Sequence, residues 1–137
     1  MDKIIEKIKM EEGDKAKMYK CPAGKWTIGA GINLEAQEMP QEVRDLWLDL
    51  IIQKQHNQML TLVDEYEGNL EDDSVDLVLF DMAYQMGVSG LLKFKKMLTA
   101  IRETDWNKAA DELLDSNYAR QTPNRAKRNA DLLRGCA

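Results

Sequence analysis

The stretch from residue 72 to residue 86 constrains the fold more than any other part of the chain. At the helical period it leaves hardly any polar face, because apolar side chains stand on almost every side. They are Val75, Leu77, Val78, Leu79, Phe80, Met82, Ala83, Tyr84 and Met86. A helix that is apolar almost all round is buried, so this one is expected at the centre of a mostly helical protein. Gly87 is expected to end it.

Helical patterns on both sides of this stretch supply the helices that would cover it. Residues 2–12 are predicted to be helical, with Asp2 capping the start and Gly13 just past the end. A second helix is expected to begin near Pro40, a favourable first-turn residue. Its apolar pattern resumes at residues 59–66, so this segment is either one long helix or two with a break near residue 59. Further helices are predicted at 93–101, 105–114 and 123–134, the last with Thr122 as its cap and Pro123 in its first turn.

Residues 16–34 have the character of short strands instead. "MYKCPAG" and "KWTIGAGINL" surround a turn at Pro22, Ala23 and Gly24, and such a turn between strand-like runs indicates a hairpin. The predicted fold class is therefore α+β, mostly α-helical, with a small antiparallel sheet near the N-terminus.

Length and charge narrow the range of functions. The chain has 137 residues and a net charge of −5, which predicts one domain, or two lobes that share a core. No apolar run reaches the roughly 18–20 residues that span a bilayer, so we expect cytosolic synthesis and no membrane insertion.

Charge is unevenly distributed along the chain. Residues 35–81 hold 13 acidic and 2 basic side chains, whereas residues 116–137 hold 1 acidic and 5 basic side chains. The basic tail either meets an anionic polymer or is a solvated helix face, and an acidic chain is a poor general nucleic-acid binder.

The two cysteines, Cys21 and Cys136, lie far apart in the sequence. In a chain of this kind they are expected to be free thiols rather than a bridge. The single histidine, His56, has no companion at metal-ligand spacing, so neither a metal nor a cofactor is predicted. His56 falls in a polar helical stretch and Trp47 and Trp106 fall at core-facing spacing, so structural roles are expected for all three.

Two glutamates end the first predicted helix. With about 100° per residue, Glu12 falls inside the apolar face formed by Ile4, Ile5 and Ile8, and Glu11 falls at its edge. A carboxylic acid that is partly buried is easier to keep protonated, as the general acid of a glycosidase requires. Glu12 is thus the better candidate for such an acid, and the alternative is that both glutamates are ordinary surface residues.

Three segments in order resemble one family. Eight residues separate Glu12 from Cys21, and five separate Cys21 from Thr27. This spacing resembles the Glu–x8–Asp/Cys–x5–Thr pattern of the phage lysozymes, glycoside hydrolase family 24. "DMAYQMGVSG" at 81–90 and "QTPNRAKR" at 121–128 are similar to two later segments of the family. The segment at 35–71 matches weakly.

The resemblance implies a role for each residue of the triad. Glu12 would be the general acid that protonates the glycosidic oxygen, and Thr27 would hold the attacking water. Cys21 stands where many members have aspartate and would help to position that water. A neighbouring carboxylate is expected to raise the pKa of the Cys21 thiol above its usual value of about 8.5, so the thiol would assist rather than act as the main base.

The resemblance also implies substrate-binding and supporting residues. Tyr84 and Gln85 match residues that contact sugar, and Arg125 matches an arginine that pairs with the catalytic glutamate. On the residues alone, core packing for Tyr84 and a solvated tail position for Arg125 stay open. Three substrate positions depart from the family's residue types, as does the histidine position that Ile32 occupies, so sugar preference is expected to differ. The three are Asn33, Met97 and Glu112.

The expected architecture is one lysozyme domain over 1–137. Its N-terminal lobe would cover about 13–58, and its C-terminal lobe about 59–137 together with helix 2–12, which would pack against that lobe. The implied activity is hydrolysis of the β-1,4 bond between N-acetylmuramic acid and N-acetylglucosamine in peptidoglycan glycan strands, by a monomer without cofactors. An endolysin of this kind would be made in the host cytoplasm and reach the wall after holin-assisted release. The alternatives are a lytic transglycosylase, a peptidoglycan-binding protein without activity, or a helical protein unrelated to sugars.

Overall fold

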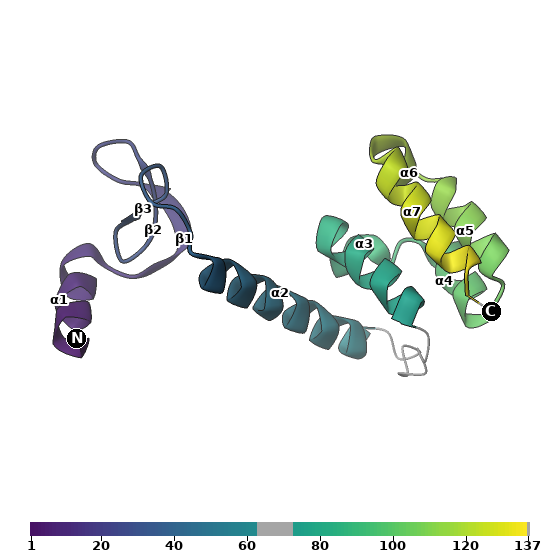
Figure 1. The fold of residues 1–137 in the computed structure, drawn as a ribbon, viewed down its shortest axis with the longest axis horizontal. Helices are drawn as coiled ribbons and strands as arrows, with labels where there is room; N and C mark the ends of the chain where they lie inside the picture. The colour runs from purple at the N-terminus through teal and green to yellow at the C-terminus, as the bar shows by residue number, and fades with distance from the viewer. Residues whose placement is uncertain (63–72, 137) are drawn as a thin grey trace. The chain divides into compact units, whose positions relative to one another are not determined.

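The computed structural model describes residues 1–62 and 73–136, and it divides into two units, Met1–Leu46 and Trp47–Ala137. Helices and strands follow the order α1, three strands β1–β3, and then helices α2–α7 (Figure 1). The α+β fold class, mostly helical with a small sheet near the N-terminus, is confirmed. Helix 2–12 belongs to the first unit by its contacts, and its packing against a C-terminal lobe stays a prediction, as do the proposed lobe boundaries.

The first unit joins one helix to a small sheet. Helix α1 spans Asp2–Glu12, as predicted, and Gly13 ends it with a φ of 78° while its N–H bonds to the Lys9 carbonyl. The prediction that Asp2 caps the helix is wrong: Met1 occupies the cap position without a side-chain hydrogen bond. The strands β1 (Lys15–Lys20), β2 (Trp26–Gly29) and β3 (Ile32–Asn33) form an antiparallel sheet in that order. Thr27 of β2 lies opposite Tyr19 on one side and Asn33 on the other.

Helix α2 spans Gln41–Leu62 without a break at residue 59. The choice between one helix and two is therefore decided in favour of one over the described part, and residues 63–66 of the predicted pattern lie outside the described residues. Its predicted apolar face is largely exposed, and Trp47 is 45% exposed. The expectation that Trp47 faces a core is therefore wrong.

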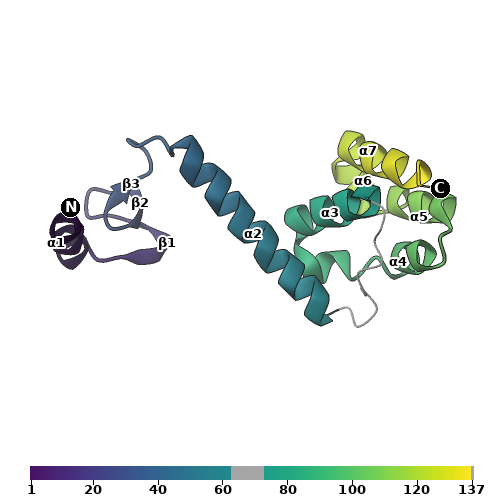
Figure 2. The same ribbon diagram turned by 60° about the horizontal axis from the view of Figure 1, so that its bottom comes forward.

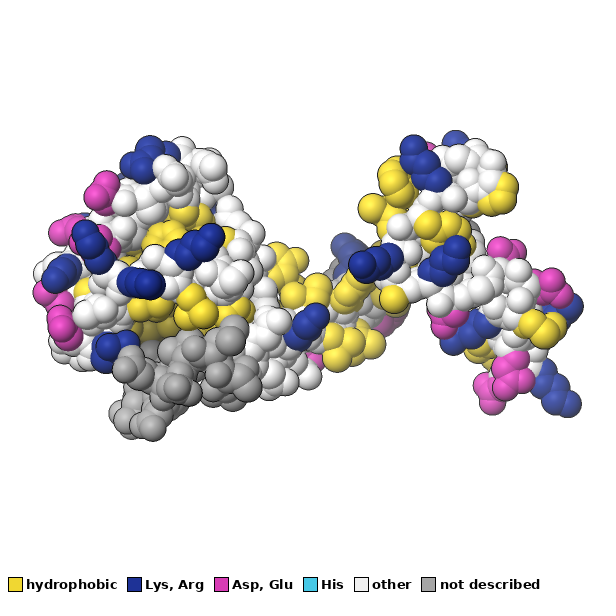
Figure 3. Space-filling view, turned by 180° about the vertical axis from the view of Figure 1, so that it is seen from behind, with side chains coloured by type: hydrophobic (Ala, Val, Ile, Leu, Met, Phe, Trp, Pro, Cys, Tyr) yellow, Lys and Arg dark blue, Asp and Glu magenta, His cyan; other side chains and the backbone are white. Residues whose placement is uncertain are grey.

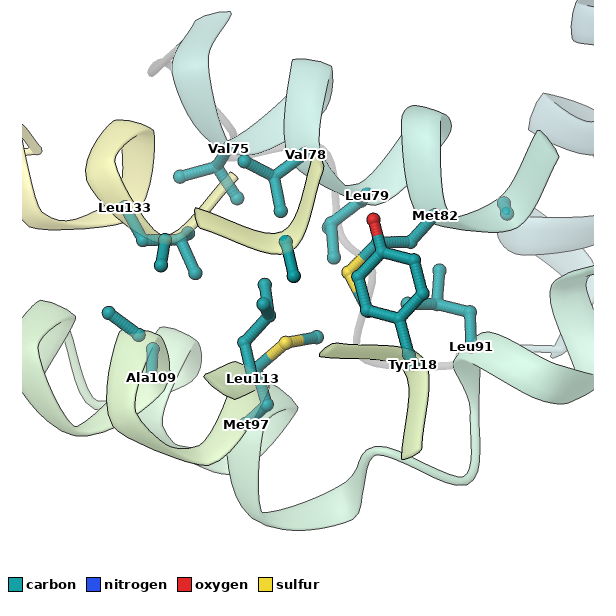
Figure 4. Close-up of a cluster of buried hydrophobic side chains, with 14 of the residues drawn as sticks. Val75, Val78, Leu79, Met82, Leu91, Met97, Ala109, Leu113, Tyr118 and Leu133 are labelled. Atoms are coloured by element: carbon teal, nitrogen blue, oxygen red, sulfur yellow. The ribbon is translucent and has the colours of Figure 1, made fainter. Parts of the chain in front are cut away.

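The second unit is built around α3, Asp73–Leu91. Val75, Val78, Leu79 and Met82 are at most 2% exposed, which confirms the buried central helix. Figure 4 shows these side chains pointing toward Met97, Leu113 and Leu133 of the other helices. Gly87 interrupts the helix with φ 78° and ψ 160°, and a further helical stretch runs on to Leu91. The buried helical stretch therefore ends at Gly87, as predicted, and the two stretches meet there at a kink.

Four shorter helices follow α3, and among them α7 packs against α3, α5 and α6 (Figure 2). Helix α6 is missing from the sequence prediction, and its start is marked by Ser116, whose hydroxyl accepts a hydrogen bond from the Ala119 N–H. Thr122 does occupy the cap position of the last helix but makes no capping bond, because its hydroxyl donates to the Tyr118 carbonyl. The four helices are α4 (Lys95–Arg102), α5 (Trp106–Leu114), α6 (Asn117–Gln121) and α7 (Pro123–Arg134).

Two further features of the described residues are the state of the cysteines and the apolar length of the helices. Neither Cys21 nor Cys136 forms a disulfide within the described residues, in line with the expectation of thiols rather than a bridge. Within residues 1–62 and 73–136, no single helix is long and apolar enough to cross a membrane. The pair Ser74–Leu91 and Lys95–Arg102 passes that test by length and composition only, with a bend of 112° between its members.

Candidate active site

The two glutamates at the end of α1 have different surroundings. Glu11 forms an ion pair with Lys7, one turn earlier on the same helix. Glu12 instead lies against the turn between β2 and β3: a Cβ atom added to Gly31 would stand 2.7 Å from its Oε2 atom. Both side chains are exposed, as is all of α1. Within Met1–Leu46 the apolar face of the helix does not bury Glu12, because Ile4, Ile5 and Ile8 are themselves 46–59% exposed. Its burial through packing against the second unit stays a prediction.

Thr27 is held in the middle strand of the sheet. It is 3% exposed, and no other residue of Met1–Leu46 is buried. Its hydroxyl donates to the Lys25 carbonyl oxygen at 2.9 Å. While its proton is directed to the Lys25 carbonyl, the lone pairs of the hydroxyl can accept a hydrogen bond from a donor such as water.

Cys21 lies at the end of β1, where the chain turns back toward β2. The Cys21 N–H bonds to the Lys25 carbonyl at 2.9 Å, and the Gly24 N–H bonds to the Cys21 carbonyl at 2.8 Å. Backbone hydrogen bonding from Lys25, more than any other group, lowers the pKa of the Cys21 thiol, and Ala23 and the Thr27 side chain act in the same direction. The expectation that a carboxylate raises this pKa is thus wrong, because the turn supplies donors that favour the thiolate.

Asn33 lies beside Thr27 in the sheet. Its Oδ1 atom accepts a hydrogen bond from the Glu35 N–H at 2.9 Å, and its carbonyl accepts one from the Gln37 N–H. Asn33 therefore orders the chain that leaves β3 as well as standing next to the candidate catalytic hydroxyl. A role in binding substrate stays a prediction.

In the second unit, three of the predicted substrate residues line one cavity of about 660 Å³: Gln85, Met97 and Glu112. Met97 is 1% exposed and belongs to the hydrophobic core, so it offers apolar surface and no polar group. The cavity also has charged walls, with Lys93, Lys95 and Lys96 from one segment and Asp115 beside Glu112. Figure 3 shows basic side chains lying over hydrophobic ones on a face of this unit.

Tyr84 lies elsewhere than the other predicted substrate residues. It lines a separate cavity of about 580 Å³, with Leu48 and Ile52 of α2 and Leu77 and Phe80 of α3. Its side chain is 48% exposed, so plain core packing does not explain it. Contact with sugar stays a prediction.

Arg125 pairs with a residue that sequence reasoning missed. Its guanidinium donates to both carboxylate oxygens of Asp81, with Nε–Oδ2 at 2.9 Å and Nη2–Oδ1 at 2.6 Å. Asn129 donates to Asp81 at 2.8 Å and to the Tyr118 hydroxyl at 3.0 Å. The guanidinium, ahead of the amide of Asn129, holds the pKa of Asp81 below its ordinary value against the opposing effect of burial. The pairing of Arg125 with Glu12 that the resemblance implies stays a prediction.

No motif in the sequence identifies Asp81 as the partner of Arg125. Asp81 is one polar residue on an apolar helix, and its partner lies 44 positions later. A polar residue on an otherwise buried helix needs a partner, which is the one clue that was present. Among the residues that the structure describes, no group of three His, Cys, Asp or Glu side chains is arranged to hold a metal ion.

The Glu12 carboxylate lies against the β2–β3 turn of the sheet that holds Thr27, and a carboxylic acid is the group that a glycoside hydrolase uses as its general acid. Comparison with known proteins agrees with that class. The phage lysozyme family matches residues 9–131, and the chain belongs to this family. It is a lysozyme-type glycoside hydrolase, and the family supports hydrolysis of peptidoglycan.

Three relatives are similar over 91% of this chain. Probable T4-type lysozymes 2 and 1 of Dictyostelium discoideum are 28% and 30% identical to it, and the match covers 89% of each. The pre-baseplate central spike protein Gp5 of Enterobacteria phage T4 is 31% identical, but the match covers only 26% of that longer protein.

Proposed function

We propose that the protein hydrolyses the β-1,4 bond between N-acetylmuramic acid and N-acetylglucosamine in peptidoglycan, with Glu12 as the general acid. The observation that carries this proposal is the contrast between the two glutamates at the end of α1. Glu11 is paired with Lys7, whereas the Glu12 carboxylate lies on the β2–β3 turn. That turn belongs to the same hairpin as Thr27.

In the proposed reaction Glu12 gives its proton to the glycosidic oxygen as the bond from that oxygen to the anomeric carbon breaks. Water attacks the anomeric carbon, so the positive charge that develops on the sugar ring is quenched by a new carbon–oxygen bond. Thr27 accepts a hydrogen bond from this water, because its own proton is directed to the Lys25 carbonyl. The proton that the water loses passes to the Cys21 thiolate or to solvent.

The lowered pKa of Cys21 supports a share in this last step, because a larger fraction of the residue is thiolate at a given pH. Cys21 then does part of the work that aspartate does in many members of the family. We expect Glu12 and Thr27 to carry most of the rate.

The cavity with Gln85, Met97 and Glu112 is proposed to contact the substrate in the second unit. Its lysines and carboxylates suit the charged groups that peptidoglycan carries, and its apolar surface suits the faces of sugar rings. Asn33 and Tyr84 are proposed as further substrate contacts, and Arg125 as a support for Glu12. We also propose that the protein is a monomeric endolysin, made in the host cytoplasm and released to the wall through holin lesions, where it would lyse the cell.

The test compares Glu12→Gln with Glu11→Gln, using clearing of outer-membrane-permeabilised Gram-negative cells and release of reducing ends from purified peptidoglycan. Loss of a general acid costs about a hundredfold or more. We expect that loss in Glu12→Gln and close to parental activity in Glu11→Gln. The reverse pattern would move the acid to Glu11. Anhydro-muramic products would indicate a lytic transglycosylase, and wall binding without turnover in the parent would indicate a binding protein.

A further inference from the structure

Two glycines flank Ala30 in the turn between β2 and β3, and both have backbone conformations that favour glycine. Gly29 has a φ of 60° and Gly31 a φ of 73°. The turn is fixed on both sides, because Ile28 pairs with Ile32 across it and Gly29 pairs with Lys15 of β1. Backbone conformation alone therefore gives the same reason for glycine at both positions.

The two glycines differ in the space available to an added Cβ atom. A Cβ atom at Gly29 would meet only the Ile32 side chain at 3.6 Å and Asp14 at 3.9 Å, which are ordinary contacts. A Cβ atom at Gly31 would meet Glu12 at three atoms: Oε2 at 2.7 Å, Cδ at 2.9 Å and Cγ at 3.0 Å. The carboxylate of Glu12 thus rests on the bare Cα of Gly31.

We infer that Gly31 is a positioning residue for Glu12, and that the β2–β3 turn acts as the surface that sets where this carboxylate lies. The inference deepens the proposed function and rests on it for its catalytic part. Gly31 and Thr27 belong to one hairpin, in which Thr27 pairs with Asn33. A carboxylate that rests on Gly31 is therefore placed relative to the hydroxyl proposed to hold the water.

A methyl group at Gly31 would act on Glu12 rather than on the fold. The atoms that it would meet are the outer part of an exposed, flexible side chain, which can turn away at little cost. Stability would then change only through the unfavourable backbone conformation, which Gly29→Ala shares. The position of the carboxylate, by contrast, would change in one variant and not in the other.

The experiment compares Gly31→Ala with Gly29→Ala as its matched control. Misplacing a catalytic group by about 1 Å costs up to about a hundredfold in rate. We expect both variants to lower Tm equally, and Gly31→Ala to lower kcat about tenfold to a hundredfold below Gly29→Ala with KM unchanged. Equal losses of kcat in the two variants would overturn the inference, since the loss would then come from the backbone conformation alone.

A second comparison asks whether the loss passes through Glu12. In a Glu12→Gln background, Gly31→Ala is expected to cost no more than Gly29→Ala, because the acid that it displaces is already gone. A loss as large as that in the parent background would assign Gly31 a structural role and contradict the inference.

The Cδ carbon of Glu12, observed by NMR in ¹³C-labelled protein and assigned by its absence in Glu12→Gln, reports the position without any turnover. Its resonance is expected to move in Gly31→Ala and to stay near the parental value in Gly29→Ala. A resonance unmoved in both would overturn the contact itself. If the resonance moves as expected but Glu12→Gln retains full activity, the contact stands, and the proposed acid role is what fails.

Discussion

The two units of the protein differ in how many of their side chains are buried. In Met1–Leu46 only Thr27 is buried, although that unit holds Glu12, Cys21 and the glycine-rich turn. In Trp47–Ala137 an extensive core of buried side chains links α3 to α4, α5 and α7. The difference indicates that stability comes mainly from the second unit, whereas the residues proposed to break the bond lie in the first. Substitutions that change stability without changing turnover, or the reverse, test this difference between the units.

The largest expected effect is on stability in the second unit. Leu113→Ala should lower the free energy of unfolding by about 2–5 kcal/mol, because it leaves a cavity at a side chain that is 0% exposed. Leu114, the next residue on α5, is 36% exposed and serves as the control. Urea unfolding of both alanine variants measures the contrast. Equal losses at the two positions would contradict the assignment of the core.

Thr27 tests the first unit, because it is the one residue there that is both buried and proposed to be catalytic. Thr27→Val keeps the shape and removes the donor to the Lys25 carbonyl, which should cost about 1 kcal/mol of stability. Turnover should fall by about tenfold or more, because the water loses its acceptor. Reducing-end assays with Thr27→Ser as the control check this. Full activity in the valine variant would remove Thr27 from the mechanism.

Asp81 tests whether the polar cluster of the second unit is structural. Asp81→Asn should lower the free energy of unfolding at pH 7 by about 1–3 kcal/mol, because it weakens charge-assisted bonds from Arg125 in a half-buried place. Asp111→Asn is the control: Asp111 also pairs with an arginine, Arg134, but its side chain is 70% exposed. Such an exposed pair contributes about 0–1 kcal/mol.

The same pair of variants gives a dependence on pH. The pKa of Asp81 is lowered in the folded protein, so its contribution is fully present above the pKa of the unfolded chain, about 3.9. It is lost as the pH falls through the lower, folded value, since both states then bind the proton. Tm measured from pH 7 downward should therefore show the gap between parent and Asp81→Asn closing below about pH 4. A difference in Tm that stays constant with pH would mean that Asp81 stabilises the fold through its packing rather than through its charge.

The smallest expected effect is a shift in reactivity at Cys21. Because the turn lowers the pKa of this thiol, its alkylation should reach half its maximal rate below the usual value of about 8.5. Mass spectrometry separates Cys21 from Cys136, which is 7% exposed and should react only on unfolding. An alkylation midpoint above about pH 8.5 would mean that a neighbouring carboxylate, rather than the turn, determines the pKa of the Cys21 thiol.

Local pattern was enough to predict several elements of the fold. Helices α1, α3 and α7 follow from apolar periodicity, from Gly13 and from Pro123, all of which act over a few residues. Helix α6 was missed because five residues are too few to show a helical period, and only the cap Ser116 marked it. The exposure of Trp47 was missed because a helical period says which residues share a face but not what covers that face.

Some features of the candidate site are likewise visible in the sequence, and others appear only in the folded chain. The spacing of Glu12, Cys21 and Thr27 is visible in the sequence, whereas the direction of the Cys21 pKa shift depends on backbone donors that a turn brings together. The glycine-rich run is equally visible, but its sequence does not say that Gly31 rather than Gly29 meets Glu12. The pair of Asp81 and Arg125 joins two helices distant in sequence, so it appears only once the chain is folded.

The most direct test of the division between the units is to measure turnover and Tm for Glu12→Gln and Leu113→Ala side by side, at a temperature where both are folded. Glu12→Gln is expected to lose about a hundredfold or more in turnover with Tm unchanged. Leu113→Ala is expected to keep the turnover of the parent while its Tm falls. Parental turnover in Glu12→Gln, or an equal loss of turnover in folded Leu113→Ala, would contradict the assignment of chemistry to the first unit and stability to the second.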